Sequence, residues 1–233
     1  DLLGKPPSIY SIEVNKWTLD AARIAIKKFN PEFTYISTTD AIMHKFSPKC
    51  KESILHFQML DESIGQLINE QPNSTFFITA DHGMSNKTQL IDIGAILNQY
   101  NIKNYSVPII KDRYVAHHSN LGGAYTIYMD DHNITESINI LSNIEGIDRA
   151  IDSNEACNIY KLNKQRIGEI IVSGSQNTVF GDSSQIELPN GLRSHGSEYE
   201  MDIPLIGYNV NNPKFEFNEN KDIGKYIINE FEL

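Results

Sequence analysis

Three short segments of the chain combine histidine with a carboxylate or a glycine turn. The first reads Ser-Thr-Thr-Asp-Ala-Ile-Met-His and supplies Asp40 and His44, and the second supplies Asp81 and His82 just before a glycine. The third, Arg-Ser-His-Gly, supplies His195. Each of these side chains can donate an electron pair to a divalent cation, so the chemistry that they indicate is metal binding.

The mixture of two carboxylates and three imidazoles favours zinc. Zn²⁺ accepts nitrogen from His and oxygen from Asp, whereas Mg²⁺ and Ca²⁺ prefer oxygen ligands. If the chain turns helical after Asp40, its side chain and that of His44 lie on one face, as a chelating pair requires. An Asp and a His at this spacing are common by chance, so the three segments together carry the prediction. Five ligands exceed the need of one catalytic zinc and are too few for two.

An acidic composition of ordinary globular type limits the partners. The 233 residues include 20 Lys and Arg against 30 Asp and Glu, a formal net charge of −10, and 40% are hydrophobic. This balance argues against nucleic acid as a partner, since proteins that bind it usually present a basic face. No apolar run reaches the length of a membrane span, and the first residues do not resemble a signal peptide. We therefore expect neither nucleic acid nor membrane as a partner.

Two cysteines, Cys50 and Cys157, belong to no metal-binding or redox motif. The possibility of one long-range disulfide between them stays open, but two reduced thiols are favoured. Reduced thiols suit a reducing compartment, so the expected location is the cytoplasm.

Helical and strand patterns alternate around the first two segments. Apolar residues recur at helical spacing over 11–29 and 53–70, and short apolar runs follow at 33–37 and 75–80. This alternation predicts an α/β fold, a mostly parallel sheet sandwiched by helices. In such a sheet, ligand-binding residues gather just beyond the carboxyl ends of the strands, where these two segments stand.

The middle of the chain has a different pattern of apolar residues. Short strand-like runs around a helical stretch at 136–144 indicate a small α/β insertion. A buried-strand run at 203–208 and an amphipathic helix at 222–231 then return to the composition of the first part. The predicted organisation is a core α/β domain over residues 1–104, a cap insertion over 105–187 and the rest of the core over 188–233.

A fourth histidine cluster, His117 and His118, also looks like a metal pair. Adjacent residues on a strand point to opposite faces, however, so they cannot easily share one ion. A cap position near the substrate or a plain surface position is favoured, and the role of the two residues stays open.

The order of the three metal-binding segments resembles a known family. Further similar stretches are Asp-Arg-Tyr-Val-Ala-His-His at 112–118, Arg-Ile-Gly-Glu-Ile-Ile-Val at 166–172 and Leu-Arg-Ser-His-Gly at 192–196. Together these motifs resemble the binuclear zinc hydrolases of the alkaline phosphatase superfamily, and within it most of all the phosphonoacetate hydrolases. The resemblance runs through most of the chain.

This resemblance implies a division of the five ligands between two zinc ions. Asp40, His44 and His195 would hold one ion, and Asp81 and His82 would hold the second. In the family, the second ion also takes an upstream Asp and the nucleophilic Thr, and neither has a counterpart here. We therefore expect the chain to be the C-terminal half to two-thirds of such an enzyme, with weak metal binding and negligible turnover by itself.

The resemblance also implies the reaction. We expect cleavage of the C–P bond of phosphonoacetate to acetate and phosphate, through a metal-activated Thr that lies upstream of this chain. A nucleotide pyrophosphatase/phosphodiesterase of the same superfamily and a catalytically inactive metal-binding fragment stay open as alternatives. The expected partner is a small-molecule phosphonate or phosphate ester. The residues that bind it are not identifiable from the sequence. Whether the protein forms a homodimer stays open.

Overall fold

The computed structural model describes residues 3–110, 119–211 and 213–231. The chain divides into two compact units. The first unit comprises Asp1–Ile42, Ser47–His82 and Asp202–Leu233, and the second comprises Met43–Phe46 and Gly83–Met201. The histidine pair His117 and His118 lies outside the described residues.

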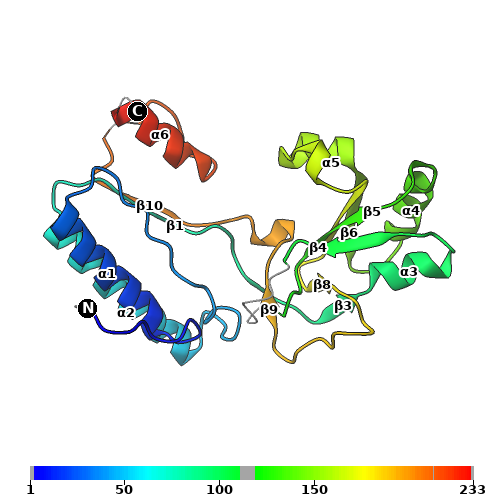
Figure 1. Cartoon of the computed structure of the whole chain (residues 1–233), viewed down its shortest axis with the longest axis horizontal. Coiled ribbons are helices and arrows are strands. Elements are labelled where there is room, and N and C mark those ends of the chain that lie inside the picture. The colour runs from blue at the N-terminus through cyan, green and yellow to red at the C-terminus, as the bar shows by residue number, and fades with distance from the viewer. Residues whose placement is uncertain (1–2, 111–118, 212, 232–233) are drawn as a thin grey trace. The chain divides into compact units, whose positions relative to one another are not determined.

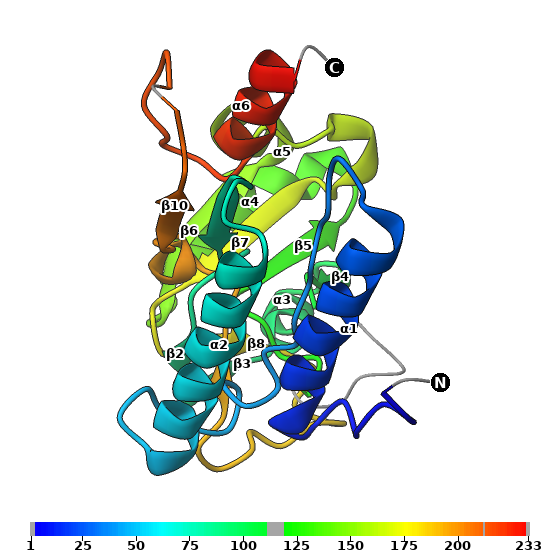
Figure 2. The ribbon, with the colours of Figure 1, turned by 90° about the vertical axis from the view of Figure 1, so that its left-hand side faces the viewer.

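The described part of the first unit contains three helices (Figures 1 and 2). The helices α1 and α2 pack side by side, and Arg23 on α1 donates to Glu70 on α2 at 3.0 Å. All three helices were expected from their apolar spacing, and the structure confirms them. Their bounds are Glu13–Phe29 for α1, Lys51–Glu70 for α2 and Lys221–Phe231 for α6.

The sheet of the first unit has two antiparallel strands, β1 (Phe76–Thr79) and β10 (Leu205–Tyr208). Both strands confirm predicted ones. The strand predicted at 33–37 is wrong: these residues join no ladder, and Phe33 and Tyr35 are 58% and 81% exposed. A strand needs a neighbour for its backbone N–H and C=O groups, and no described strand takes that place.

The second unit is built on a four-stranded antiparallel sheet with the order β4-β5-β7-β6. Fully buried side chains of the sheet, including Ile127, Ile170 and Val172, pack with Leu97 and Leu141 from two helices. The elements of this layer are β4 (Tyr105–Pro108), β5 (Ala124–Tyr128), β6 (Ile147–Asp152), β7 (Ile170–Gly174), α3 (Ile93–Gln99), α4 (Ile134–Leu141) and α5 (Ser153–Tyr160).

Two short ladders complete the second unit. β2 (Ser85–Asn86) pairs antiparallel with β9 (Arg193–Ser194), and β3 (Gln89–Ile91) pairs parallel with β8 (Thr178–Phe180). A 3-10 helix, η3 (Glu198–Glu200), follows β9. The β2–β9 ladder joins the residues that follow Asp81 and His82 to the residues just before His195.

The predicted α/β class is confirmed, but the strand pairing differs from the expected one. Among the described strands only β3 and β8 run parallel. The range 105–187 falls inside the second unit, which also holds 83–104 and 188–201, so the cap boundaries stay a prediction. Cys50 and Cys157 are both free. None of the described helices has the length and apolar character that crossing a bilayer requires.

Candidate metal centre

The imidazole of His44 is held by the backbone of a residue far along the chain. His44 lies in the turn at 41–45 and is 2% exposed. Its Nδ1 is 2.6 Å from the carbonyl oxygen of Arg193, and because a carbonyl only accepts, Nδ1 carries the proton. A metal ion would therefore bind through Nε2, the arrangement usual for ligating histidines.

His195 lies beside His44 in the second unit. The centroids of the two rings are 5.5 Å apart, with 59° between their planes. The carbonyl oxygen of His195 accepts a hydrogen bond from the N–H of Gly123 at 2.8 Å. Gly196, the next residue, has φ of +110°, a conformation that side chains rarely adopt. A Cβ atom there would also lie 3.2 Å from the backbone nitrogen of Gly123 and 2.4 Å from Cδ1 of Ile109, so the Ile109 side chain would have to move.

Arg193 fastens the turn of His44 to strand β9. Its side chain is nearly buried and donates to three acceptors, each through a different nitrogen. Nε reaches the carbonyl oxygen of Met43 at 2.8 Å, Nη2 that of Met84 at 3.0 Å, and Nη1 reaches Oδ1 of Asn86 at 2.5 Å. Sequence reasoning did not assign this arginine a role. The only signal was its place two residues before His195.

A buried polar network in the first unit fixes the residue before Asp40. Asn15 on α1 accepts from the N–H of Thr39 at 2.9 Å and donates to its carbonyl oxygen at 2.8 Å. The same amide nitrogen donates to Nε2 of His56 on α2 at 2.8 Å. Burial lowers the pKa of His56, which agrees with a neutral ring that accepts this hydrogen bond. His56 is therefore a structural residue.

His44 and His195 of the second unit could hold a metal ion together, and Asp40 is the third ligand that the sequence predicts for it. One carboxylate and two imidazoles make a donor set that Zn²⁺ accepts, and the side chains present fit such an ion. Asp40 stands only four residues before His44, and the backbone hydrogen bonds to Asn15 and Arg193 fix the residues on either side of this stretch.

Asp81 and His82, predicted to hold a second ion, follow strand β1 in the first unit, and this assignment stays a prediction. The Asp81 side chain is 87% exposed, and its Oδ2 is 3.6 Å from Nε2 of His82. A shallow hollow of the second unit is lined by Tyr100, His132 and residues of α4, and none of the five predicted ligands contributes to it.

With this fold and geometry, the chain can be compared with known proteins. The profile of the type I phosphodiesterase / nucleotide pyrophosphatase family matches residues 12–198, so the chain belongs to this family. The resemblance to the alkaline phosphatase superfamily found in the sequence is thereby confirmed.

Solved structures refine the comparison. Phosphonoacetate hydrolase from Sinorhizobium meliloti, in complex with phosphonoformate or with phosphonoacetate, matches 97% of this chain at 28% identity and a TM-score of 0.83. Murine ectonucleotide pyrophosphatase/phosphodiesterase 5 matches 92% of this chain at 16% identity and a TM-score of 0.64. The chain covers 57% of the bacterial and 59% of the murine chain, less than two thirds of either. The predicted alkaline-phosphatase-like fold is confirmed.

Proposed function

We propose that this chain is part of a zinc-dependent hydrolase that cleaves the C–P bond of phosphonoacetate to acetate and phosphate. The observation that carries the proposal is the likeness to phosphonoacetate hydrolase over 97% of the chain at a TM-score of 0.83. The likeness to the murine pyrophosphatase relative is weaker in both identity and TM-score.

The proposed metal ligands are the five residues expected from the sequence. Asp40, His44 and His195 would hold one zinc ion, and Asp81 and His82 would hold the second. The first set is supported by the neighbouring rings of His44 and His195 and by the hydrogen bond at Nδ1 of His44. Bound zinc supplies Lewis-acid chemistry, which activates a hydroxyl nucleophile and stabilises charge on the leaving group.

The residues of this chain contribute orientation to that chemistry. The carbonyl of Arg193 keeps the proton of His44 on Nδ1, so that the other ring nitrogen retains its lone pair. The guanidinium of Arg193 holds Met43 and Met84, which prevents the turn from leaving β9. Hydrolysis replaces the P–C bond by a P–O bond, and the carbon leaving group takes up a proton.

Other parts of the proposal concern the nucleophile, the substrate and the location. The nucleophile would be a Thr upstream of this chain, and the substrate a small phosphonate or phosphate ester. Because the net charge is −10, an anionic substrate has to be attracted by charge within the site and not by the chain as a whole. A cytoplasmic location is proposed from the two free cysteines.

A nucleotide pyrophosphatase/phosphodiesterase is the second candidate, because the description of the matching family names that activity. A substrate panel separates the candidates: phosphonoacetate, a nucleotide diester and a simple aryl phosphate, each offered to the complete protein with zinc. We expect phosphate release from phosphonoacetate to be the fastest. Preferential cleavage of the nucleotide diester would establish the second candidate instead.

The substitution His195→Ala tests the metal assignment directly. We expect the complete protein to lose one zinc ion and most of its activity, because two ligands cannot hold the ion with catalytic affinity. Zinc is measured by elemental analysis, and His132→Ala, which changes an exposed histidine, is the control. Equal zinc content in the His195 variant and the wild type would overturn the assignment.

A further inference from the structure

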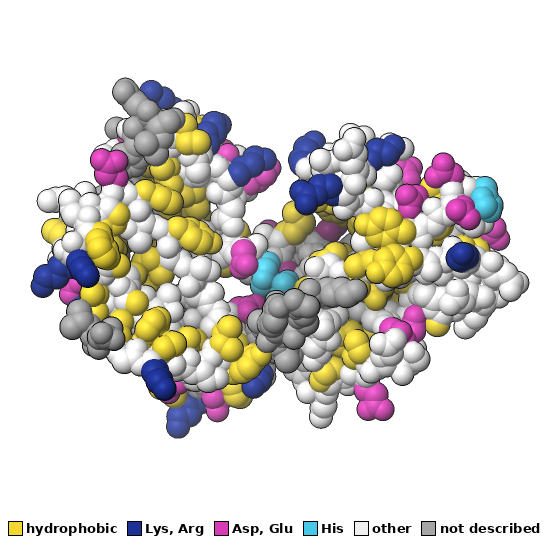
Figure 3. Space-filling view, in the orientation of Figure 1, with side chains coloured by type: hydrophobic (Ala, Val, Ile, Leu, Met, Phe, Trp, Pro, Cys, Tyr) yellow, Lys and Arg dark blue, Asp and Glu magenta, His cyan; other side chains and the backbone are white. Residues whose placement is uncertain are grey.

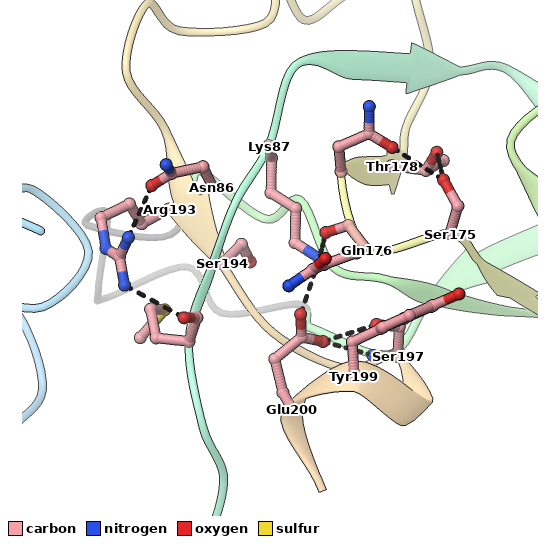
Figure 4. A network of polar contacts seen from close by, with 12 residues as sticks. Asn86, Lys87, Ser175, Gln176, Thr178, Arg193, Ser194, Ser197, Tyr199 and Glu200 are labelled. Atoms are coloured by element: carbon pink, nitrogen blue, oxygen red, sulfur yellow. Dashed lines mark hydrogen bonds and ion pairs between the residues drawn. The ribbon is translucent and has the colours of Figure 1, made fainter. Parts of the chain in front are cut away.

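A buried ion pair connects the segment after His195 to the segment after β2. The Nζ atom of Lys87 donates to Oε1 of Glu200 at 3.0 Å, and the two side chains are 0% and 1% exposed. Lys87 also donates to the carbonyl oxygen of Gln176 at 2.8 Å. Figure 4 shows the pair and its partners. The proposed chemistry uses neither charged residue.

Glu200 fixes the first turn after the histidine. Its Oε2 accepts hydrogen bonds from the N–H of Ser197 at 2.9 Å and from the hydroxyl of Ser197 at 2.7 Å. These bonds cap η3, which begins three residues after His195. The carbonyl oxygen of Glu200 accepts from the N–H of Gly83 at 2.6 Å. The side chain of Glu200 therefore holds the start of the turn at Ser197, and its backbone carbonyl attaches the end of η3 to Gly83.

The electrostatic surroundings keep the Glu200 carboxylate ionised. Burial acts to raise the pKa of Glu200, but hydrogen bonds from Ser85 and Ser197 and the charge of Lys87 outweigh it, so this pKa is lowered. Burial lowers the pKa of Lys87, and Glu200 opposes that shift. The carboxylate thus accepts hydrogen bonds at both of its oxygens.

The segment before His195 is attached to the same stretch of chain. Strand β9 pairs with β2, and the N–H of Lys87 donates to the carbonyl oxygen of Leu192 at 2.9 Å. His195 and Gly196 therefore bridge two fixed ends, β9 and the capped turn at Ser197. Both ends are attached to residues 83–87.

An ion pair buried this deeply is an inefficient way to stabilise a fold. The loss of hydration offsets most of the attraction, and apolar side chains of similar volume often give equal or greater stability. A carboxylate with both oxygens hydrogen-bonded does, however, fix the geometry of the groups around it. We propose that Lys87 and Glu200 are positioning residues that hold His195 in place for metal binding, an inference that rests on the proposed function in taking His195 as a ligand.

Three variants of this chain test the proposal. Lys87→Met/Glu200→Met removes both charges together, so that no unpaired charge stays buried. Ser197→Ala is milder, because it keeps the ion pair and removes one donor to Glu200. Glu198→Gln is the matched control, since Glu198 lies on the same 3-10 helix but its pair with Arg149 is at the surface, 39% and 38% exposed.

The readouts are the melting temperature, the imidazole NMR signals of His195 in the metal-free chain, and the dissociation constant for Zn²⁺. For the double variant we expect shifted or broadened His195 signals. The dissociation constant for Zn²⁺ should rise about tenfold or more, while the melting temperature stays close to that of the wild type. Ser197→Ala should move the same signals less, and Glu198→Gln should leave them unchanged. If the double variant does not fold, Ser197→Ala carries the test.

Two results would overturn the positioning role. Unchanged His195 signals and unchanged zinc affinity in the folded double variant and in Ser197→Ala would show that the pair is only structural. Equal signal changes in Glu198→Gln would show that the effect is not specific to the buried pair. If the wild type binds no Zn²⁺, the proposed function fails, and the metal-free NMR signals alone decide whether Lys87 and Glu200 position His195.

Discussion

In the candidate metal centre, single residues that make several hydrogen bonds set the positions of the imidazole rings. Arg193 is the clearest case, because its backbone carbonyl orients His44 while its side chain donates to the backbone carbonyls of Met43 and Met84. A planar guanidinium can reach three acceptors in fixed directions, which a lysine ammonium on a flexible stem cannot. The residue that orients a ligand can thus matter as much as the ligand itself.

Arg193→Lys should therefore weaken both the fold and the metal site. We expect the free energy of unfolding to fall by about 2 kcal/mol, since hydrogen bonds of a nearly buried charged group are lost. Zinc affinity should fall about tenfold or more, as the orientation of His44 loosens. Urea unfolding and zinc titration check this, with Arg149→Lys at the surface as the control. Unaltered zinc affinity in the Arg193 variant would contradict it.

His56 makes the stability of the first unit depend on pH. Its folded-state pKa is lowered by burial, so the unfolded chain binds a proton more readily than the folded chain does. The stability due to the neutral ring is complete above the unfolded pKa of about 6.5 and is lost as the pH falls towards the folded pKa. The slope of this loss is at most about 1.4 kcal/mol per pH unit.

The measurement is urea unfolding between pH 7.5 and 5. We expect the free energy of unfolding of the wild type to decrease over this range, and the decrease to be smaller in His56→Gln. Replacement of the exposed His132 by Gln should leave the slope as it is. An identical slope in the wild type and His56→Gln would show that another group is responsible.

Among single residues, the sequence suggests the candidate ligands but not the residues that support them. His44 and His195 stand in short motifs whose residue types indicate metal binding when the three segments are taken together. His44 and Arg193 are 149 positions apart, and Lys87 and Glu200 are 113 positions apart. No local pattern reports such pairs, because only the fold brings them together.

Among the elements, the turn after β9 is tightly constrained. Gly196 combines a positive φ with a close approach of Ile109, and it directly follows a proposed ligand. The β2–β9 ladder has only two residues in each strand, so this turn depends on the buried ion pair and on Arg193 for its place.

Gly196→Ala should displace His195. The backbone strain costs about 1–3 kcal/mol, and the clash with Ile109 adds to it. Gly191→Ala is a matched control, because Gly191 has φ of +72° but no atom within 4 Å of an added Cβ. We expect the Gly191 variant to lose about 1 kcal/mol of stability and to keep its zinc affinity, whereas the Gly196 variant loses both. Equal losses in the two variants, measured by urea unfolding and zinc titration, would show that the contact with Ile109 is unimportant.

The elements themselves were largely predictable. The helices α1, α2, α4 and α6 follow apolar stripes that bury one face, which a period of 3.6 residues reveals. The run at 33–37 has strand composition, yet composition cannot supply a neighbouring strand, and no described strand pairs with it. The antiparallel order of the larger sheet could not be deduced for a related reason, since strand pairing is decided by contacts between distant segments.

At the scale of the whole molecule, the first unit exposes many large hydrophobic side chains. Hydrophobic side chains are visible over β1 and β10 and over the helices in Figure 3. The exposed set includes Phe29, Phe33, Tyr35, Ile54, Phe57, Ile206 and Ile228. All four residues of β10 are exposed.

This surface predicts the behaviour of the chain in isolation. We expect strong binding of the dye 8-anilinonaphthalene-1-sulfonate and concentration-dependent association in sedimentation velocity. Replacing Tyr35 and Ile206 by Ser should reduce both, while replacing the similarly exposed Tyr105 and Ile159 of the second unit should have less effect. Weak dye binding by a folded wild-type chain, or equal effects of the two double variants, would contradict the prediction.

The hydrogen bond between His44 and the carbonyl of Arg193 also has a consequence for biosynthesis. Its two partners are 149 positions apart, so after His44 a ribosome has to add 149 further residues to reach Arg193. At about 5–20 residues per second this delay is roughly 7–30 s. Throughout that interval the nascent His44 imidazole has no Arg193 carbonyl to fix its tautomer, and the oriented histidine pair can arise only after Arg193 has been translated.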